Sequence, residues 1–171
     1  LASHPLTRWT GPIGLPDFPK IDDDGFEPVL DAALVAHARE IEAIAGNRDA
    51  PTIANTLAAL EQAGDALSRV SSIFWMRAGA HTNDAVRALE RKVAPKMSRH
   101  FSAIYMNAAL FARIDALYAR REVLDLDAET KRVLEKTWKR FVKAGASLGE
   151  ADKARLAAIN EELALLGARF G

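Results

Sequence analysis

The spacing of apolar residues constrains this chain more than any other feature of its sequence. From residue 25 onward one face recurs at intervals of three and four, as Leu30, Leu34, His37, Ile41 and Ile44 illustrate. A period near 3.6 is typical of an amphipathic α-helix, whereas a half-buried strand would alternate at every second residue. No segment of this chain alternates in that way. The sequence therefore predicts an all-α protein, a multi-helix bundle of about seven helices.

Capping residues and helix breakers set the expected helix boundaries. Asn and Asp side chains cap helix N-termini, glycine often ends a helix, and an internal proline removes a hydrogen-bond donor. The helices are expected between Asp24 and Gly46, Ala50 and Gly79, Thr82 or Asn83 and Pro95, Pro95 and Tyr105, Asn107 and Leu117, Asp125 or Asp127 and Gly149, and Leu156 and Phe170. Pro95 is expected to break the helical ladder, so that two helices meet there.

Residues 1–24 are expected to form an extended Pro/Gly-rich docking arm, followed by a helical domain at 25–171. Prolines and glycines punctuate this stretch, and proline both fixes φ and lacks an N–H. Four large apolar side chains lie between them, namely Trp9, Ile13, Leu15 and Phe18. Because a free linker would not carry so many, we expect these side chains to dock on another surface.

Charge and cysteine content exclude several classes of protein. Lys plus Arg and Asp plus Glu are 23 each, so no net charge would draw the chain onto nucleic acid or an anionic membrane. The absence of cysteine excludes disulfides, thiolate zinc sites, iron–sulfur clusters and a cysteine nucleophile. No stretch approaches the roughly 20 apolar residues of a membrane span. We expect a soluble cytoplasmic protein with no nucleic-acid or membrane partner.

The four histidines form no recognisable catalytic or metal motif. None begins H-E-x-x-H, and none follows a glutamate by three residues as in a di-iron bundle. His37 and Glu40, like His81 and Asp84, are three apart, but two ligands hold a metal poorly. We expect His37 at a seam between helices and His81 in a connection, and we assign no catalytic, metal or substrate-binding residue in this chain. A competing interpretation brings His4, His37 and His81 together on a metal ion.

Two groups of basic residues are expected to form solvated helix faces, because acidic residues are interleaved with them and the chain is neutral. They are Arg87, Arg91, Lys92, Lys96 and Arg99, and Arg113, Arg120 and Arg121. Aromatic residues at helical spacing are expected in the core. These are Phe74, Trp75, Phe101, Trp138 and Phe141.

Several collinear stretches, spread over essentially all 171 residues, carry a family resemblance. They are Trp9–Phe18, Phe26–Pro28, Ala50–Leu57, Ala80–Asp84, Val93–Lys96, Ile104–Tyr105, Asn107–Ile114 and Leu163–Phe170. In these stretches the chain resembles the N-terminal helical region of thimet-oligopeptidase-like zinc metallopeptidases, in their peptidyl-dipeptidase and oligopeptidase branch. The first stretch is most similar to the dipeptidyl carboxypeptidase subgroup, which releases dipeptides from peptide C-termini.

The resemblance implies a longer, mostly helical, two-lobed parent enzyme with a deep channel between its lobes. In this family the two histidines of H-E-x-x-H and a downstream glutamate hold one zinc ion, and the motif's own glutamate activates the metal-bound water. All of these residues would lie beyond Gly171, so the zinc belongs to the parent enzyme and none to this chain. The implied role is a non-catalytic wall that admits short unstructured peptides, with the missing catalytic lobe as its partner.

The last expected helix carries an apolar stripe that continues up to the end of the chain. The stripe consists of Leu156, Ile159, Leu163, Leu166 and Phe170, and Gly171 is a candidate C-cap. We expect a truncated chain whose stripe, together with Trp9 and Phe18 of the arm, joins the missing lobe, and which can self-associate in isolation. The alternatives are a natural terminal helix docked on the bundle and a stand-alone helical binding or scaffold module without peptidase activity.

Overall fold

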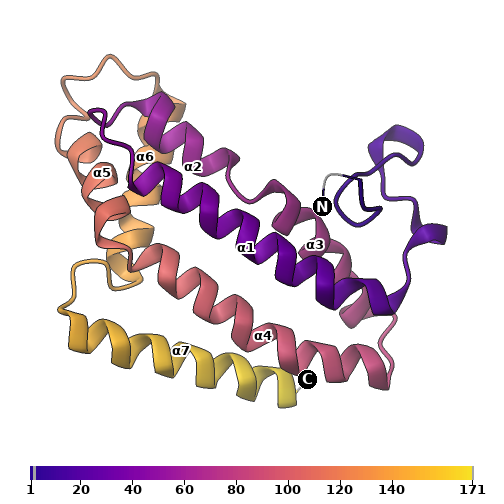
Figure 1. Cartoon of the computed structure of the whole chain (residues 1–171). Helices are drawn as coiled ribbons and strands as arrows, with labels where there is room; N and C mark the ends of the chain where they lie inside the picture. The colour runs from indigo at the N-terminus through magenta and orange to yellow at the C-terminus, as the bar shows by residue number, and fades with distance from the viewer. Residues whose placement is uncertain (2, 171) are drawn as a thin grey trace.

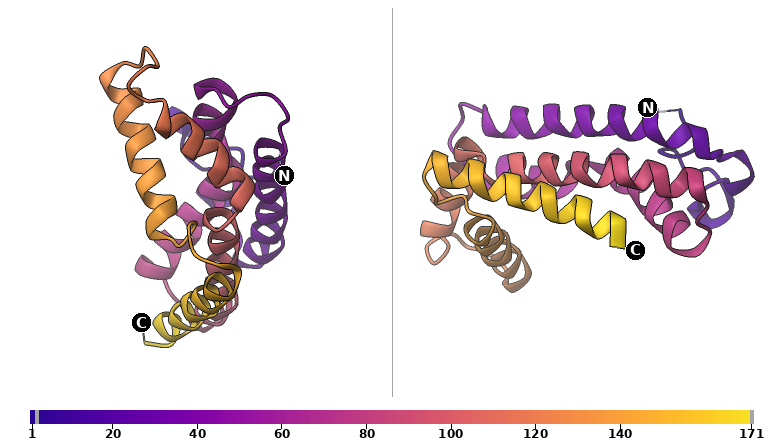
Figure 2. Two further views of the ribbon diagram at one scale, coloured as in Figure 1. Left: turned by 90° about the vertical axis from the view of Figure 1, so that its left-hand side faces the viewer. Right: turned by 90° about the horizontal axis from the view of Figure 1, so that it is seen from below.

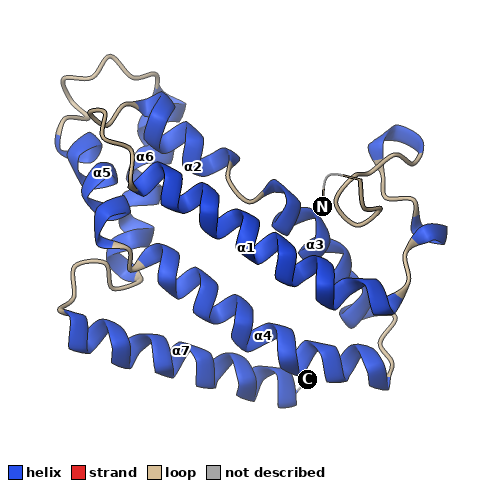
Figure 3. Cartoon of the chain, in the orientation of Figure 1, coloured by secondary structure: helices blue, strands red, loops and turns tan. Residues whose placement is uncertain are grey.

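A computed structural model describes Leu1 and residues 3–170 of the chain. All regular structure in these residues is helical, without a strand (Figure 3). The α-helices are α1 (Phe26–Ala45), α2 (Ala59–Gln62), α3 (Asp65–Ala80), α4 (Asp84–Tyr105), α5 (Ala108–Ala119), α6 (Ala128–Lys143) and α7 (Glu150–Phe170). The all-α prediction is confirmed, and six of these helices are longer than α2, which has 4 residues. The proposed C-cap, Gly171, lies outside the described residues.

Side-chain caps begin three of the helices as predicted. Asn83, Asn107 and Asp127 each accept a hydrogen bond from the backbone N–H three residues further on. Such a bond satisfies one of the unpaired N–H groups at a helix N-terminus. Of the alternatives that the sequence left open, the caps are therefore Asn83 rather than Thr82 and Asp127 rather than Asp125.

The helix predicted between Ala50 and Gly79 is divided at Gly64, so that prediction was wrong. A π-helical segment, η4 (Ile53–Ala58), continues into α2, and α3 begins after a break. Gly64 has φ +82°, a left-handed conformation that L side chains rarely adopt. The apolar spacing continues across the break, which is why periodicity alone did not reveal it.

The predicted break at Pro95 was also wrong, because α4 runs without interruption from Asp84 to Tyr105. Proline inside a helix removes a hydrogen bond and crowds the preceding turn, at a cost of about 3 kcal/mol. Val93 and Ile104 are buried on either side of it, and Met97 packs against the core between them. Burial of both halves of α4 against the bundle outweighs the local preference of Pro95.

The helices enclose two hydrophobic clusters arranged along the molecule (Figure 1). The first joins residue Leu6, the N-terminal half of α1, α3 and the N-terminal half of α4. The second joins the C-terminal half of α1, η4, the end of α4, α5 and α6. Helix α7 lies alongside α4 (Figure 2). Because α1 and α4 contribute to both clusters, they form the axis of the fold.

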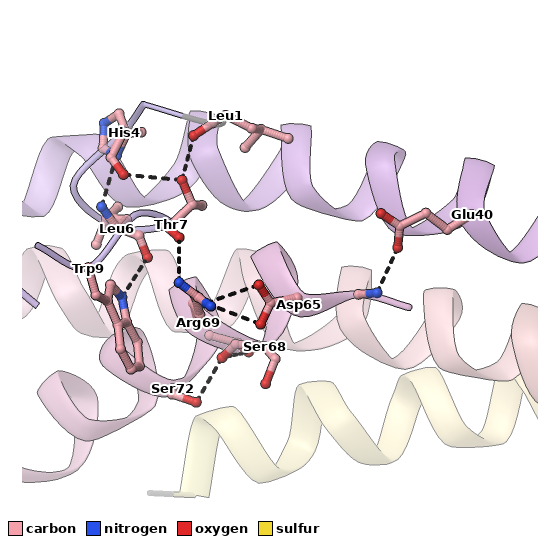
Figure 4. A network of polar contacts seen from close by, with 12 residues as sticks. Leu1, His4, Leu6, Thr7, Trp9, Glu40, Asp65, Ser68, Arg69 and Ser72 are labelled. Atoms are coloured by element: carbon pink, nitrogen blue, oxygen red, sulfur yellow. Dashed lines mark hydrogen bonds and ion pairs between the residues drawn. The ribbon is translucent and has the colours of Figure 1, made fainter. Parts of the chain in front are cut away.

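The arm docks through fewer side chains than predicted. Trp9 packs against the first cluster and donates from Nε1 to the Leu6 carbonyl, and Leu6 itself is fully buried (Figure 4). Ile13, Leu15 and Phe18 are exposed instead, with Ile13 at 95%. Three short 3-10 turns replace a fully extended chain here. Within the described chain, Trp9 therefore docks and the other three side chains do not, and the expectation that Phe18 joins a further lobe stays a prediction.

The first basic group lies largely at the surface, as predicted, and part of it joins two helices. Lys96 contacts Asp31 at 2.7 Å and Lys92 contacts Glu27 at 3.1 Å, which links α4 to α1. Trp75 was placed in the core by its spacing, but 38% of it is exposed on α3. The other four aromatic residues of that set are buried or packed against the two clusters.

We expect Gly64→Ala to destabilise the protein by about 2 kcal/mol, because the new Cβ would be strained by the positive φ and crowded by a neighbouring ring. A Cβ at Gly64 would lie 2.9 Å from His37 Cε1. The matched control is Gly79→Ala in α3, where a Cβ meets nothing within 4 Å. That variant should be neutral or more stable by about 0.5–1 kcal/mol. Urea unfolding followed by circular dichroism measures both, and equal stability of the two variants would contradict this account.

Candidate functional site

Two histidines from α1 and α4 meet where the two helices cross. His37 Nδ1 and His100 Nε2 are 3.0 Å apart, and His37 is buried. One ring nitrogen must donate and the other accept, so at least one imidazole of the pair is neutral. Burial lowers the pKa of His37, and burial followed by the nearby charge of His37 lowers the pKa of His100 to about 4. At neutral pH the seam holds two uncharged, hydrogen-bonded rings.

The backbone at Gly64 closes over this pair. The Gly64 N–H donates to Glu40 Oε2 at 2.7 Å (Figure 4). Helix α1 thus supplies both this acceptor and the His37 ring that lies against Gly64. The Glu40 carboxylate also opposes, more weakly than burial, the lowering of the His37 pKa. Sequence reasoning placed His37 at a helix seam, which is confirmed. It missed His100, since no local pattern relates residues 63 positions apart.

A groove with an aromatic floor runs along α4 beside this seam. Phe101 and Tyr105 line two adjoining pockets, one bounded by α2 and α6 and the other by α7. The Arg140 guanidinium lies 4.6 Å from the Tyr105 ring centroid, and burial raises the pKa of Tyr105. Glu61 faces the same pocket. The groove therefore offers aromatic surface together with one cation and one carboxylate, a set suited to binding.

Arg113 was predicted on a solvated face, but it is buried inside the bundle, so that prediction was wrong. Its Nη1 donates to the Asn47 and Asp49 carbonyl oxygens at 2.7 and 3.0 Å. Its Nη2 donates to Asn55 Oδ1 and Thr56 Oγ1 at 2.9 and 3.0 Å. The side chain thus fixes the connection between α1 and η4. Arg113 lies three residues after buried Leu110, and this helical spacing was the sequence signal for a buried position.

The residues described here do not fit a zinc site. No group of three or more His, Asp or Glu residues in that part of the chain is arranged to hold a metal ion. His37 contacts His100, whereas His4 lies near Gly25 and His81 is exposed at the end of α3. The structure thus does not bring His4, His37 and His81 together as the competing interpretation required. His81 lies in a connection, as predicted.

Two curated proteins match nearly the whole chain. Dipeptidyl carboxypeptidase from Escherichia coli (strain K12) is 41% identical over 165 residues, which are 96% of this chain and 24% of that protein. Dipeptidyl carboxypeptidase from Salmonella typhimurium is 43% identical over 159 residues, which are 93% of this chain and 23% of that protein. No family model matches the chain.

The chain is similar, over nearly its whole length, to part of the dipeptidyl carboxypeptidases. The family resemblance drawn from its residues is thereby confirmed, and the chain spans about a quarter of the length of the relatives it matches. The helices and groove described above are thus features of a peptidase-related region.

Among the described residues, every helix is too short or too polar to cross a membrane.

Because both histidines of the seam are uncharged at neutral pH, the free energy of unfolding should decrease as the pH falls below the ordinary pKa of histidine. Unfolded histidine binds a proton near pH 6.5, whereas folded His100 does so only near pH 4. Between these values the unfolded state binds more protons, so the stability present above pH 6.5 is lost as the pH falls toward 4. We expect His100→Gln to reduce this loss by about 2 kcal/mol between pH 7 and 4.5.

Urea unfolding at several pH values measures this dependence. The control is His81→Gln, because His81 is exposed and lies outside the seam. The stability of this variant should depend on pH as that of the unaltered protein does. It therefore serves as the reference from which the contribution of surface carboxylates is subtracted. Identical profiles for the two variants would show that the seam does not carry the effect.

We expect Arg113→Met to destabilise the protein by about 3 kcal/mol, because it removes four hydrogen bonds that join α5 to residues 47–56, one of them to the buried Thr56 hydroxyl. The control is Arg120→Met, an exposed residue at the C-cap of α5 that should change stability by at most about 0.5 kcal/mol. Thermal unfolding measures both. Hydrogen exchange at residues 47–56 should accelerate only in the Arg113 variant, and unchanged exchange there would contradict the proposed role.

Proposed function

We propose that this chain is the N-terminal, non-catalytic helical wall of a zinc-dependent peptidyl-dipeptidase that releases C-terminal dipeptides from short peptides. The observation that carries the proposal is the match to both dipeptidyl carboxypeptidases over nearly all of this chain. The proposal keeps the division into an arm at 1–24 and a helical domain at 25–171. It also keeps a cytoplasmic location, since a chain without cysteine has no need of an oxidising compartment.

In this proposal the chemistry belongs to the remainder of the polypeptide. The described residues lack a set that could hold zinc, so we assign them no catalytic step. A zinc ion held elsewhere would supply an activated water and polarise the scissile carbonyl. The contribution of this region is to shape and exclude, because a narrow rigid channel selects unstructured peptides before any bond is broken.

The groove along α4 is the part of this region best suited to face such a peptide. Its floor is aromatic, and its edge carries Arg140 and Glu61. Aromatic surfaces bind varied side chains, and two charges of opposite sign at the edge can each contact a complementary group of a peptide. The groove is anchored to α1 by the histidine seam and therefore keeps its shape when a peptide binds.

Dipeptide release by the full-length gene product tests this proposal. We expect the full-length protein to release only C-terminal dipeptides from an N-terminally blocked hexapeptide, as measured by mass spectrometry. A chelator should abolish release, and added zinc should restore it. This chain alone should release none, and a small folded protein should remain intact with either.

The pattern of products separates the alternatives. Internal fragments would indicate an endopeptidase rather than a dipeptide-releasing enzyme. A full-length protein that binds the peptide without cleaving it, with or without zinc, would favour the helical binding module and overturn the proposal.

A further inference from the structure

Helix α7 has two faces of different character, and only one of them is in contact with α4. Toward α4 it presents Lys153, Asn160 and Glu161, of which Lys153 is buried and Glu161 pairs with Arg99. Asn160 Nδ2 donates to Ser102 Oγ at 3.5 Å. Ala157 and Ala164 share this face by their spacing and let the two helices approach closely.

A second face of α7 is apolar and exposed. Ile159, Leu163, Leu166 and Phe170 are 44%, 59%, 49% and 97% exposed, and their spacing of four, three and four places them on one stripe. We call these four residues the outer stripe of α7. Other exposed apolar residues, such as Val35 on α1, occur singly or in pairs along the described helices. A continuous apolar stripe of this kind marks an interaction surface.

We propose that the outer stripe of α7 is the surface on which the remainder of the full-length polypeptide docks. This inference rests on the proposed function, since it takes the chain to be one part of a longer enzyme. The matched relatives extend over about four times the matched length, because the alignments cover 24% and 23% of them. A covalently attached segment acts at a high effective concentration, which favours it over a second copy of this chain.

The charges around the stripe agree with a protein partner rather than a membrane or nucleic acid. Arg155, Glu162 and Arg169, seven residues apart, lie along one edge of the stripe, so that edge carries both signs of charge. An anionic lipid surface or nucleic acid would select a one-sided basic border. A rim of mixed charges around an apolar centre is the usual composition of a protein interface.

The stripe also adjoins the groove along α4. Asn160 lines the groove together with Phe101 and Tyr105, and Leu163 of the stripe lies three residues further on, one turn along the same side of α7. A segment seated on the stripe would therefore lie at the groove's α7 edge. The same docking event that buries the stripe would supply the facing wall of the proposed channel.

Cysteine labelling tests the proposal, because this chain has no cysteine of its own. Leu163→Cys is made in the full-length protein and in this chain, with Val35→Cys as the matched control of similar exposure. Labelling by a maleimide is followed by peptide mapping, so that cysteines elsewhere in the full-length protein do not interfere. We expect the ratio of the Leu163→Cys rate to the Val35→Cys rate to be at least tenfold lower in the full-length protein than in the isolated chain.

A smaller change in that ratio would overturn the proposal. Protection that disappears on dilution would also overturn it, since the occupant would then be a second copy. The result is independent of peptidase activity. A full-length protein that protects position 163 but releases no dipeptide would disprove the proposed function and leave the docking surface in place. An active protein in which position 163 is unprotected would disprove the docking surface and leave the proposed function in place.

Discussion

The close approach of the Gly64 backbone to the His37 ring determines how these helices are arranged. Gly64 turns the chain between α2 and α3, and its amide is held by Glu40 of α1. The same ring is hydrogen-bonded to His100 of α4. Three segments distant in sequence therefore meet at one imidazole. Because a Cβ at Gly64 would overlap that ring, only glycine permits this packing.

Helix α4, which contains His100 of that junction, also connects the two core clusters. Val86 and Val93 belong to one core cluster and Ile104 to the other, so α4 must stay continuous to connect them. Its continuity through Pro95 shows tertiary burial prevailing over a local preference. The groove floor and the surface that receives α7 both lie on α4. Hence the candidate site depends on a helix that sequence reasoning divided in two.

The features that could be predicted from the sequence are those decided within a few residues. Asn83 and Asn107 cap helices through hydrogen bonds from the backbone N–H three residues further on, so both partners lie within one short stretch of sequence. Gly64 and Arg113 are decided by partners 24 to 66 residues away. His37 lies between these cases, because its spacing predicted a seam but its partner could not be identified. Local rules thus defined the helices better than the candidate site.

Helix α7 shows how one helix supplies two different surfaces. Small side chains such as Ala157 allow close packing on α4, whereas bulky Leu163 on the other face is left without a partner. Reversing the two faces would place bulky side chains at the α4 contact and move α7 away from the groove. The distribution of small and large residues around α7 therefore sets the distance of this helix from α4 and with it the width of the groove.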